Sequence, residues 1–373
     1  MPSSATSRRV ELIVAVIAIA VGAAFVVSAV VTTGDISGLI RFGEGPGSVE
    51  IVAHAEDVLG RDVAKVPKEG HDGKFFFVQA LDPLYLSPDT HAVHLDRPVY
   101  RAQRMLFPLI AGVGGLLPAE ATMWSMALVN ITALALGTIG TARLAQRFGG
   151  TPWLGLAFTL NPGMMFELDL SGAGVIAFAC AIWGTLALIE QRHRQAIAWF
   201  IAAVLAREVM LLYLAGVCCH QLWTNRRIPW LLGAIPFSTV VAWGLYLRLR
   251  LDAGTGVDEV QEFGIPFGGI LDAYPNWIDE PANFAMIAGL LIVMPLLIVR
   301  AVQRPNPLAW GALGFVVLAV LMTRQVWWNG YDMTRAIAPV FSAYIVTTFA
   351  SPGETRSAEL VRADGPNESA AAT

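Results

Sequence analysis

Charged side chains are scarce in this 373-residue chain: Asp, Glu, Lys and Arg make up only 14% of it, while 55% is hydrophobic. A soluble domain carries about 25% charged residues. The core of a soluble protein of this size cannot absorb that excess of apolar surface, whereas lipid can. The composition therefore argues against an ordinary soluble fold. The net charge of -4 also argues against nucleic acid as a partner.

Several catalytic signatures are also missing. The chain has no GxxxxGK[ST] loop, no HExxH helix and no GxSxG elbow, which argues against ATP-driven transport, zinc proteolysis and serine hydrolysis by these signatures. Its three cysteines, Cys180, Cys218 and Cys219, have no spacing that suits zinc or a disulfide framework. Charged residues are sparse at the centres of the expected helices, which weakens the case for a proton-coupled transporter because such proteins use intramembrane relays.

Long apolar runs are what the sequence has in abundance. The first run, 10–31, is longer than the apolar core of a signal peptide and is expected to remain as a spanning helix. A crossing needs about 20 apolar residues, so several shorter runs do not span alone, and about eight to ten crossings are expected. We predict an all-α polytopic membrane protein with apolar segments at 10–31, 105–118, 121–142, 152–166, 172–189, 196–206, 208–222, 229–247, 283–299, 307–323 and 334–350.

Basic clusters predict the orientation, because they mark the cytoplasmic ends of membrane helices. They occur at 8–9, 143–147, 192–194, 226–227 and 300–304. Placing them inside gives a multi-pass protein of the cell membrane with both termini in the cytoplasm. The segments left outside are a long loop at 32–104, a second loop at 252–282, and short turns near 161–171 and 325–333.

Two segments fit this arrangement only with adjustment. Segment 105–118 is expected to be re-entrant or to reach half depth, and 196–206 with 208–222 is expected to form a short hairpin that turns near Arg207. Residues 1–350 then make a single transmembrane bundle. Residues 351–373 are polar and are expected to form a disordered cytoplasmic tail, because they hold too little apolar surface to fold.

The first outer loop carries the polar residues of greatest interest. Its stretch GHDGKFFFVQALDPLYL places glycines on either side of the pair His71-Asp72. Glycine permits a tight turn, which would leave the carboxylate of Asp72 accessible, and the phenylalanines that follow are expected to lie at the membrane interface. Asp72 is the candidate catalytic residue, although Asp in such a turn also serves as a plain Asx-turn residue. Asp82 and Asp96 are candidate substrate-binding residues.

Arginines follow as the chain re-enters the bilayer. Arg97, Arg101 and Arg104 recur at helical spacing and are expected to share a face. Arg101 and Arg104 are candidates for binding a lipid phosphate, which a guanidinium grips with two hydrogen bonds. The alternative is that they anchor the helix among the lipid headgroups.

Further candidate substrate-binding residues fall where other segments meet the outer side. An ionisable side chain persists in a membrane when it faces a partner or a water-filled cavity. Structural ion pairs between helices are one explanation, and a shared cavity at the outer leaflet is the one that we favour because the clusters lie on one side. These residues are Asp169, Arg207, Glu208, Asp332 and Arg335.

The layout resembles the GT-C superfamily of membrane glycosyltransferases. The matching residues are Asp72 in GHDGKFFF and Arg101, Arg104 and Pro108 in YRAQRMLFP, together with LAREVMLL and YDMTRAIAP further along. The resemblance implies a sugar donor linked to a polyprenyl phosphate and a glycan or lipid acceptor at the outer face. It also implies that Asp72 is a general base or helps to bind a divalent metal, and that the arginines bind the phosphate. Many family members carry two adjacent acids here, whereas Asp72 stands beside His71.

Two other functions remain open from the sequence. One is a non-enzymatic transporter or flippase of lipids or glycans, in which Arg207 and Glu208 should matter more than Asp72. The other is a scaffold subunit of an envelope-assembly complex, in which none of these residues should be sensitive to substitution.

Overall fold

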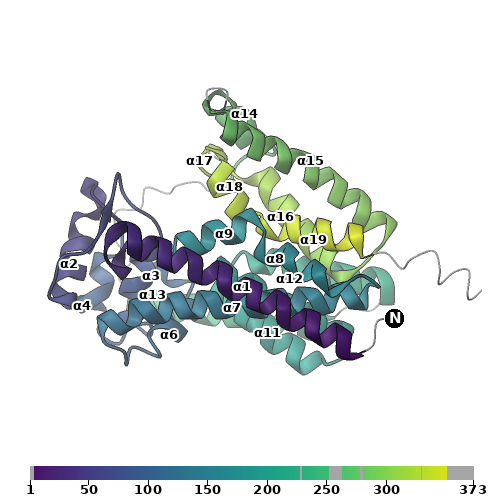
Figure 1. Ribbon diagram of the computed structural model, residues 1–373, viewed down its shortest axis with the longest axis horizontal. Helices are drawn as coiled ribbons and strands as arrows, with labels where there is room; N and C mark the ends of the chain where they lie inside the picture. The colour runs from purple at the N-terminus through teal and green to yellow at the C-terminus, as the bar shows by residue number, and fades with distance from the viewer. Residues whose placement is uncertain (1–3, 227–228, 252–262, 278–279, 329, 351–373) are drawn as a thin grey trace, which may run out of the picture.

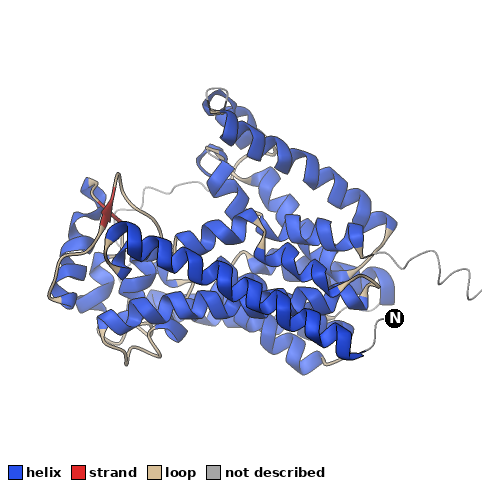
Figure 2. Ribbon diagram, viewed as in Figure 1, coloured by secondary structure: helices blue, strands red, loops and turns tan. Residues whose placement is uncertain are grey.

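The computed structural model describes residues 4–226, 229–251, 263–277, 280–328 and 330–350. These residues form nineteen α-helices and one two-stranded parallel ladder, so the predicted all-α fold is confirmed (Figure 2). The strands are β1 (Phe42–Gly43) and β2 (Lys65–Val66). The helices are α1 (Ser4–Thr33), α2 (Val49–Leu59), α3 (Gly73–Leu81), α4 (Pro88–His91), α5 (Pro98–Ala102), α6 (Leu106–Ala111), α7 (Ala119–Arg147), α8 (Leu156–Thr159), α9 (Pro162–Asp169), α10 (Gly174–Ile189), α11 (His193–Ala206), α12 (Met210–Asn225), α13 (Trp230–Arg250), α14 (Gly268–Ala273), α15 (Pro281–Gln303), α16 (Pro307–Leu321), α17 (Arg324–Trp327), α18 (Gly330–Ala336) and α19 (Ala338–Phe349).

Four of the described helices are long and apolar enough to cross a membrane, namely α1, α7, α13 and α15. Helices α10, α16 and α19 are apolar but shorter. Helix α10 lies in the core between α7 and α11, and most of its side chains are buried. Helices α13 and α15 instead leave most of their apolar side chains exposed. Exposed apolar faces of this kind are compatible with a membrane protein.

The ends of α7 define two ends of the bundle. At its first turn Glu120 forms an ion pair with Arg61 of the loop 32–104, at 2.6 Å. At its last turns Arg143 pairs with Glu11 of α1 at 3.1 Å, so α1 and α7 run antiparallel (Figure 1). The 29 residues of α7 span ~43 Å at 1.5 Å per residue. The loop 32–104 and the basic residues near position 143 therefore lie at opposite ends.

The loop 32–104 folds into short helices at one end of the bundle (Figure 1). The expectation that Phe75, Phe76 and Phe77 lie at a membrane interface is wrong, because all three are buried in the hydrophobic core. Phe76 packs edge-on against Phe107 of α6, and Phe77 packs edge-on against Phe42. These rings fix α3 to the bundle and hold the residues before it in place.

The structure describes both segments that fitted the predicted topology only with adjustment. Segment 105–118 contains the six-residue helix α6, which is too short to span a bilayer. The predicted turn near Arg207 is confirmed, because α11 ends at Ala206, Arg207 is extended, and α12 begins at Met210. Much of the second predicted outer loop (252–262 and 278–279) and the predicted tail 351–373 lie outside the described residues.

Candidate functional site

Two glycines set the position of Asp72. Gly70 has a φ of +69°, a value that side-chain-bearing residues rarely adopt. Gly73 packs so closely that a Cβ there would lie 2.6 Å from the carbonyl oxygen of Ile40 and 2.8 Å from that of Leu170. The motif thus presses Asp72 against the end of α9. The side chain of Asp72 makes no capping hydrogen bond to the start of α3, so the plain turn explanation does not account for it.

Asp72 faces three guanidinium groups from distant parts of the chain. Its Oδ1 accepts a hydrogen bond from NH1 of Arg101 at 2.9 Å. Its Oδ2 accepts one from NH2 of Arg335 at 3.3 Å and lies 4.0 Å from NH1 of Arg104. Burial raises the pKa of Asp72, but the positive charges of Arg335, Arg101 and Arg104 outweigh burial and hold that pKa below its usual range. Asp72 is therefore ionised in this arrangement.

Arg101 and Arg104 are each held by a second carboxylate. Arg101 donates from Nε and NH2 to the two oxygens of Asp96, both at 2.9 Å, and its guanidinium lies 3.9 Å from the ring centre of Phe75. Arg104 donates from Nε and NH2 to the two oxygens of Glu208, both at 3.3 Å. These two-point contacts fix the orientation of both guanidinium planes.

Glu167 joins the helices beneath this layer. It is 2% exposed and accepts hydrogen bonds from Nε of Arg335 at 3.2 Å, NH1 of Arg207 at 3.3 Å and the backbone N–H of Gly174 at 2.9 Å. Arg335 also pairs with Asp332 at 3.4 Å. Glu167 was not among the candidate substrate-binding residues. Its place after Asn161-Pro162, at the same turn as the candidate Asp169, is the signal that could have included it.

The structure brings eight of the expected site residues into one ion-pair network with Glu167, which we call the arginine–carboxylate cluster. Its members are Asp72, Asp96, Arg101, Arg104, Glu167, Arg207, Glu208, Asp332 and Arg335.

Three expectations turn out differently. Asp82 accepts hydrogen bonds from the backbone N–H groups of Leu86 and Ser87, so it shapes its own turn. Asp169 pairs with Arg41 at 2.5 Å, a partner that the sequence did not suggest because 128 residues separate the two. Arg97, Arg101 and Arg104 do not share the face of one helix, because Arg97 caps α5 and Arg104 lies beyond its end at Ala102.

The carboxylates of the cluster do not suit a divalent metal ion. Each one lies within ion-pair distance of a guanidinium group. No group of three or more His, Cys, Asp or Glu side chains in the described part of the chain is arranged to hold a metal. The donor set does not fit the divalent metal that the resemblance allowed.

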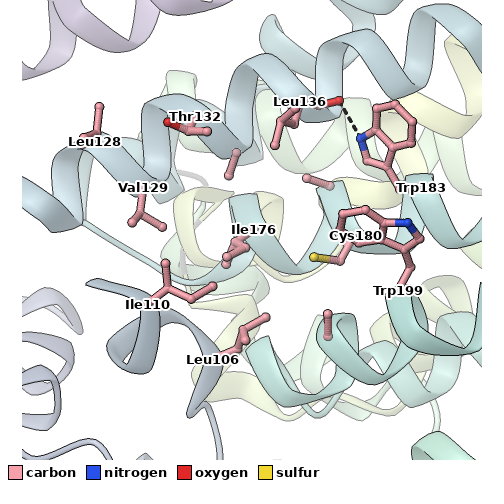
Figure 3. A pocket seen from close by; sticks show the side chains of 13 residues that line it. Leu106, Ile110, Leu128, Val129, Thr132, Leu136, Ile176, Cys180, Trp183 and Trp199 are labelled. Carbon is pink, nitrogen blue, oxygen red and sulfur yellow. Dashed lines mark hydrogen bonds between the residues drawn. The ribbon is translucent and has the colours of Figure 1, made fainter. Parts of the chain in front are cut away.

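An apolar groove of about 400 Å³ lies between α6, α7, α10 and α11 (Figure 3). Trp183 and Trp199 lie at one end of it, and Trp183 donates a hydrogen bond to the carbonyl oxygen of Leu136 at 3.0 Å.

Three residues of the groove lie a few positions along the chain from the cluster. Leu106 lies two residues after Arg104, and Ala202 lies five residues before Arg207. Ile176 lies two residues after Gly174, whose N–H binds Glu167. Helices α6, α10 and α11 therefore each contribute to the groove and continue toward the cluster.

Comparison with protein-family models, curated proteins and solved structures finds no match to this chain.

Proposed function

We propose that this chain is a membrane glycosyltransferase that moves a sugar from a polyprenyl-phosphate donor to an envelope glycan or lipid acceptor. The observation that carries the proposal is that α6 and α11, which line the apolar groove, lead directly to Arg104 and Arg207 of the arginine–carboxylate cluster. A polyprenyl-phosphate sugar has a long apolar chain and an anionic phosphate, and the two surfaces match these parts. A soluble nucleotide-sugar would have no use for the groove.

The groove supports a position for the lipid chain. Its lining is almost wholly apolar and includes Leu106, Ile176 and Ala202 near the cluster and Trp183 and Trp199 further along. A prenyl chain that moves from the bilayer into the groove exchanges one apolar surrounding for another, so van der Waals packing against this lining is what would hold it.

The arginines support a position for the phosphate. NH1 of Arg101 and NH1 of Arg104 are both directed toward the carboxylate of Asp72. Charge-assisted hydrogen bonds from guanidinium to phosphate are strong and directional. They also stabilise the negative charge that develops as the phosphate departs.

In the proposed reaction Asp72 accepts the proton of an acceptor hydroxyl. The hydroxyl oxygen forms a bond to the anomeric carbon from the face opposite the phosphate. The bond between the anomeric carbon and the phosphate oxygen breaks, and its electron pair leaves with the phosphate toward Arg101 and Arg104. The anomeric configuration is inverted, and the products are the glycosylated acceptor and a polyprenyl phosphate.

We further propose that the cluster lies at the outer face of the cell membrane, with both termini in the cytoplasm and about eight to ten crossings. The basic residues Arg143 and Arg147 lie at the end of α7 that is remote from the loop 32–104. Basic residues favour the cytoplasmic end of membrane helices, which supports this orientation.

The test is a pair of substitutions in cells, Asp72→Asn and Arg101→Ala, with lipid-linked sugars and envelope glycans profiled by mass spectrometry. We expect the donor lipid to accumulate and one glycan class to be lost. Asp89→Asn, an exposed position on α4 of the same loop, is the matched control. Stable expression of both variants with an unchanged glycan profile would rule out the enzyme. Donor lipid trapped on one side of the membrane would instead indicate a transporter.

A further inference from the structure

Arg101 and Arg104 use the three nitrogens of their guanidinium groups in the same way. In each, Nε and NH2 bind a dedicated carboxylate, Asp96 for Arg101 and Glu208 for Arg104. In each, NH1 is directed to Asp72, at 2.9 Å from Arg101 and 4.0 Å from Arg104. The NH1 groups are therefore the nitrogens that a phosphate can take without dismantling the contacts that hold the two arginines.

We propose that Asp72 and the donor phosphate compete for these two NH1 groups, so that arrival of the phosphate frees one carboxylate oxygen of Asp72 for the acceptor. This inference rests on the proposed function for the identity of the donor. It adds that the base is coupled to donor binding.

The geometry indicates which oxygen is freed. Within the described part of the chain, the donor to Oδ1 of Asp72 is NH1 of Arg101, whereas NH2 of Arg335 donates to Oδ2. Arg335 is itself fixed through Nε by Glu167 at 3.2 Å. A phosphate at the two NH1 groups therefore releases Oδ1 and leaves Oδ2 anchored, so the carboxylate keeps its place while one oxygen becomes available.

The coupling also explains how Asp72 can act as a base although its pKa is low before the donor binds. Three guanidinium groups hold the pKa of Asp72 below its usual range, beyond the opposing effect of burial, so with these contacts Asp72 is a weak base. A phosphate that takes up the positive charge of Arg101 and Arg104 raises the pKa of Asp72 again. The acceptor is then deprotonated only when a donor is present.

The inference is tested by binding, apart from activity. The full-length protein in nanodiscs is titrated with a polyprenyl phosphate that carries no sugar, and with the neutral polyprenol. Asp72→Asn should bind the phosphate lipid about fivefold more tightly, because a competing partly exposed ion pair is removed. Binding of the polyprenol should not change. Asp89→Asn makes the same charge change in the same loop and should bind both lipids like the unsubstituted protein.

A double substitution provides the second readout. In the Arg101→Ala background, Asp72→Asn should tighten binding less than it does in the unsubstituted protein, because one of the two contested nitrogens is gone. Thermal unfolding of each variant checks that it is folded, and Asp72→Ser replaces Asp72→Asn if the latter is not recovered.

Weaker or unchanged binding by Asp72→Asn would overturn the competition. If Asp72→Asn binds more tightly but the unsubstituted protein transfers no sugar, the competition stands and the glycosyltransferase proposal fails. If the unsubstituted protein transfers sugar but Asp72→Asn does not bind more tightly, the glycosyltransferase proposal stands and the competition fails.

Discussion

Nε of Arg335 lies 3.2 Å from Oε1 of Glu167, although 168 residues separate them in the chain. The same carboxylate accepts from NH1 of Arg207. One buried acid thus ties the end of α9 to α18 and to the break between α11 and α12. The orientation of Arg335, and through it that of Asp72, depends on this acid.

Replacing Glu167 with Gln should lower the free energy of unfolding by ~3 kcal/mol, because it leaves two guanidinium groups without their buried counter-charge. Asp96→Asn should cost ~1 kcal/mol or less, since the side chain of Asp96 is 42% exposed. Thermal and denaturant unfolding in the same detergent measure both. Equal losses for the two variants would show that Glu167 is not the hub of the cluster.

Arg104→Lys keeps the positive charge but removes the planar fork that binds Glu208 at two points. We expect about tenfold weaker binding of a polyprenyl phosphate, because an ammonium group cannot hold Glu208 and present a second donor to phosphate in the same geometry. Arg143→Lys, at the other end of α7, is the matched control. Full retention of binding by Arg104→Lys would contradict a directional contact with phosphate.

Ala179→Phe narrows the apolar groove on α10, one turn before Trp183 and further along the groove than Leu106, Ile176 and Ala202. Binding of a long-chain polyprenyl phosphate should weaken about tenfold, whereas an analogue with one or two prenyl units should bind as before. Ala285→Phe adds the same ring to an exposed position on α15 and serves as the control. An equal loss for both chain lengths would place the lipid chain outside the groove.

Three histidines predict an acid-sensitive contact in the loop 32–104. Nε2 of His54 lies 3.0 Å from Nδ1 of His91, and the ring of His54 stacks on that of His94 at 4.0 Å. Burial, His94 and His91 lower the pKa of His54 to about 4, against a smaller opposing effect of Asp57.

The unfolded chain therefore binds more protons at His54 than the folded chain between about pH 6.5 and about pH 4. The stability that this neutral histidine contributes is present above about pH 6.5 and is lost as the pH falls through that range. The protection factors of the amides in 88–96, which are exchange rates corrected for the intrinsic effect of pH, should fall between pH 7.5 and pH 5. His54→Gln should reduce this pH dependence, and His193→Gln should leave it intact. Protection factors that do not depend on pH in the unsubstituted protein would refute it.

The sequence predicts much of this architecture because apolar runs and a glycine-flanked Asp are local signals. The long helices, the turn near Arg207 and the gathering of Asp72 with Arg101 and Arg335 all follow from position along the chain. The pairing of Arg41 with Asp169 does not, because no local pattern records which distant acid meets which base. The burial of the three phenylalanines was missed for a similar reason, since an apolar run before a membrane segment has the same composition in a core as at an interface.

The near balance of charge in the arginine–carboxylate cluster has a consequence for turnover. A product phosphate that lies among nearly neutralised partners is held by local geometry more than by a surplus of positive field, so its residence time should be short and each catalytic cycle can end without a trapped lipid product. In the described residues, four guanidinium groups (Arg101, Arg104, Arg207 and Arg335) stand against five carboxylates (Asp72, Asp96, Glu167, Glu208 and Asp332).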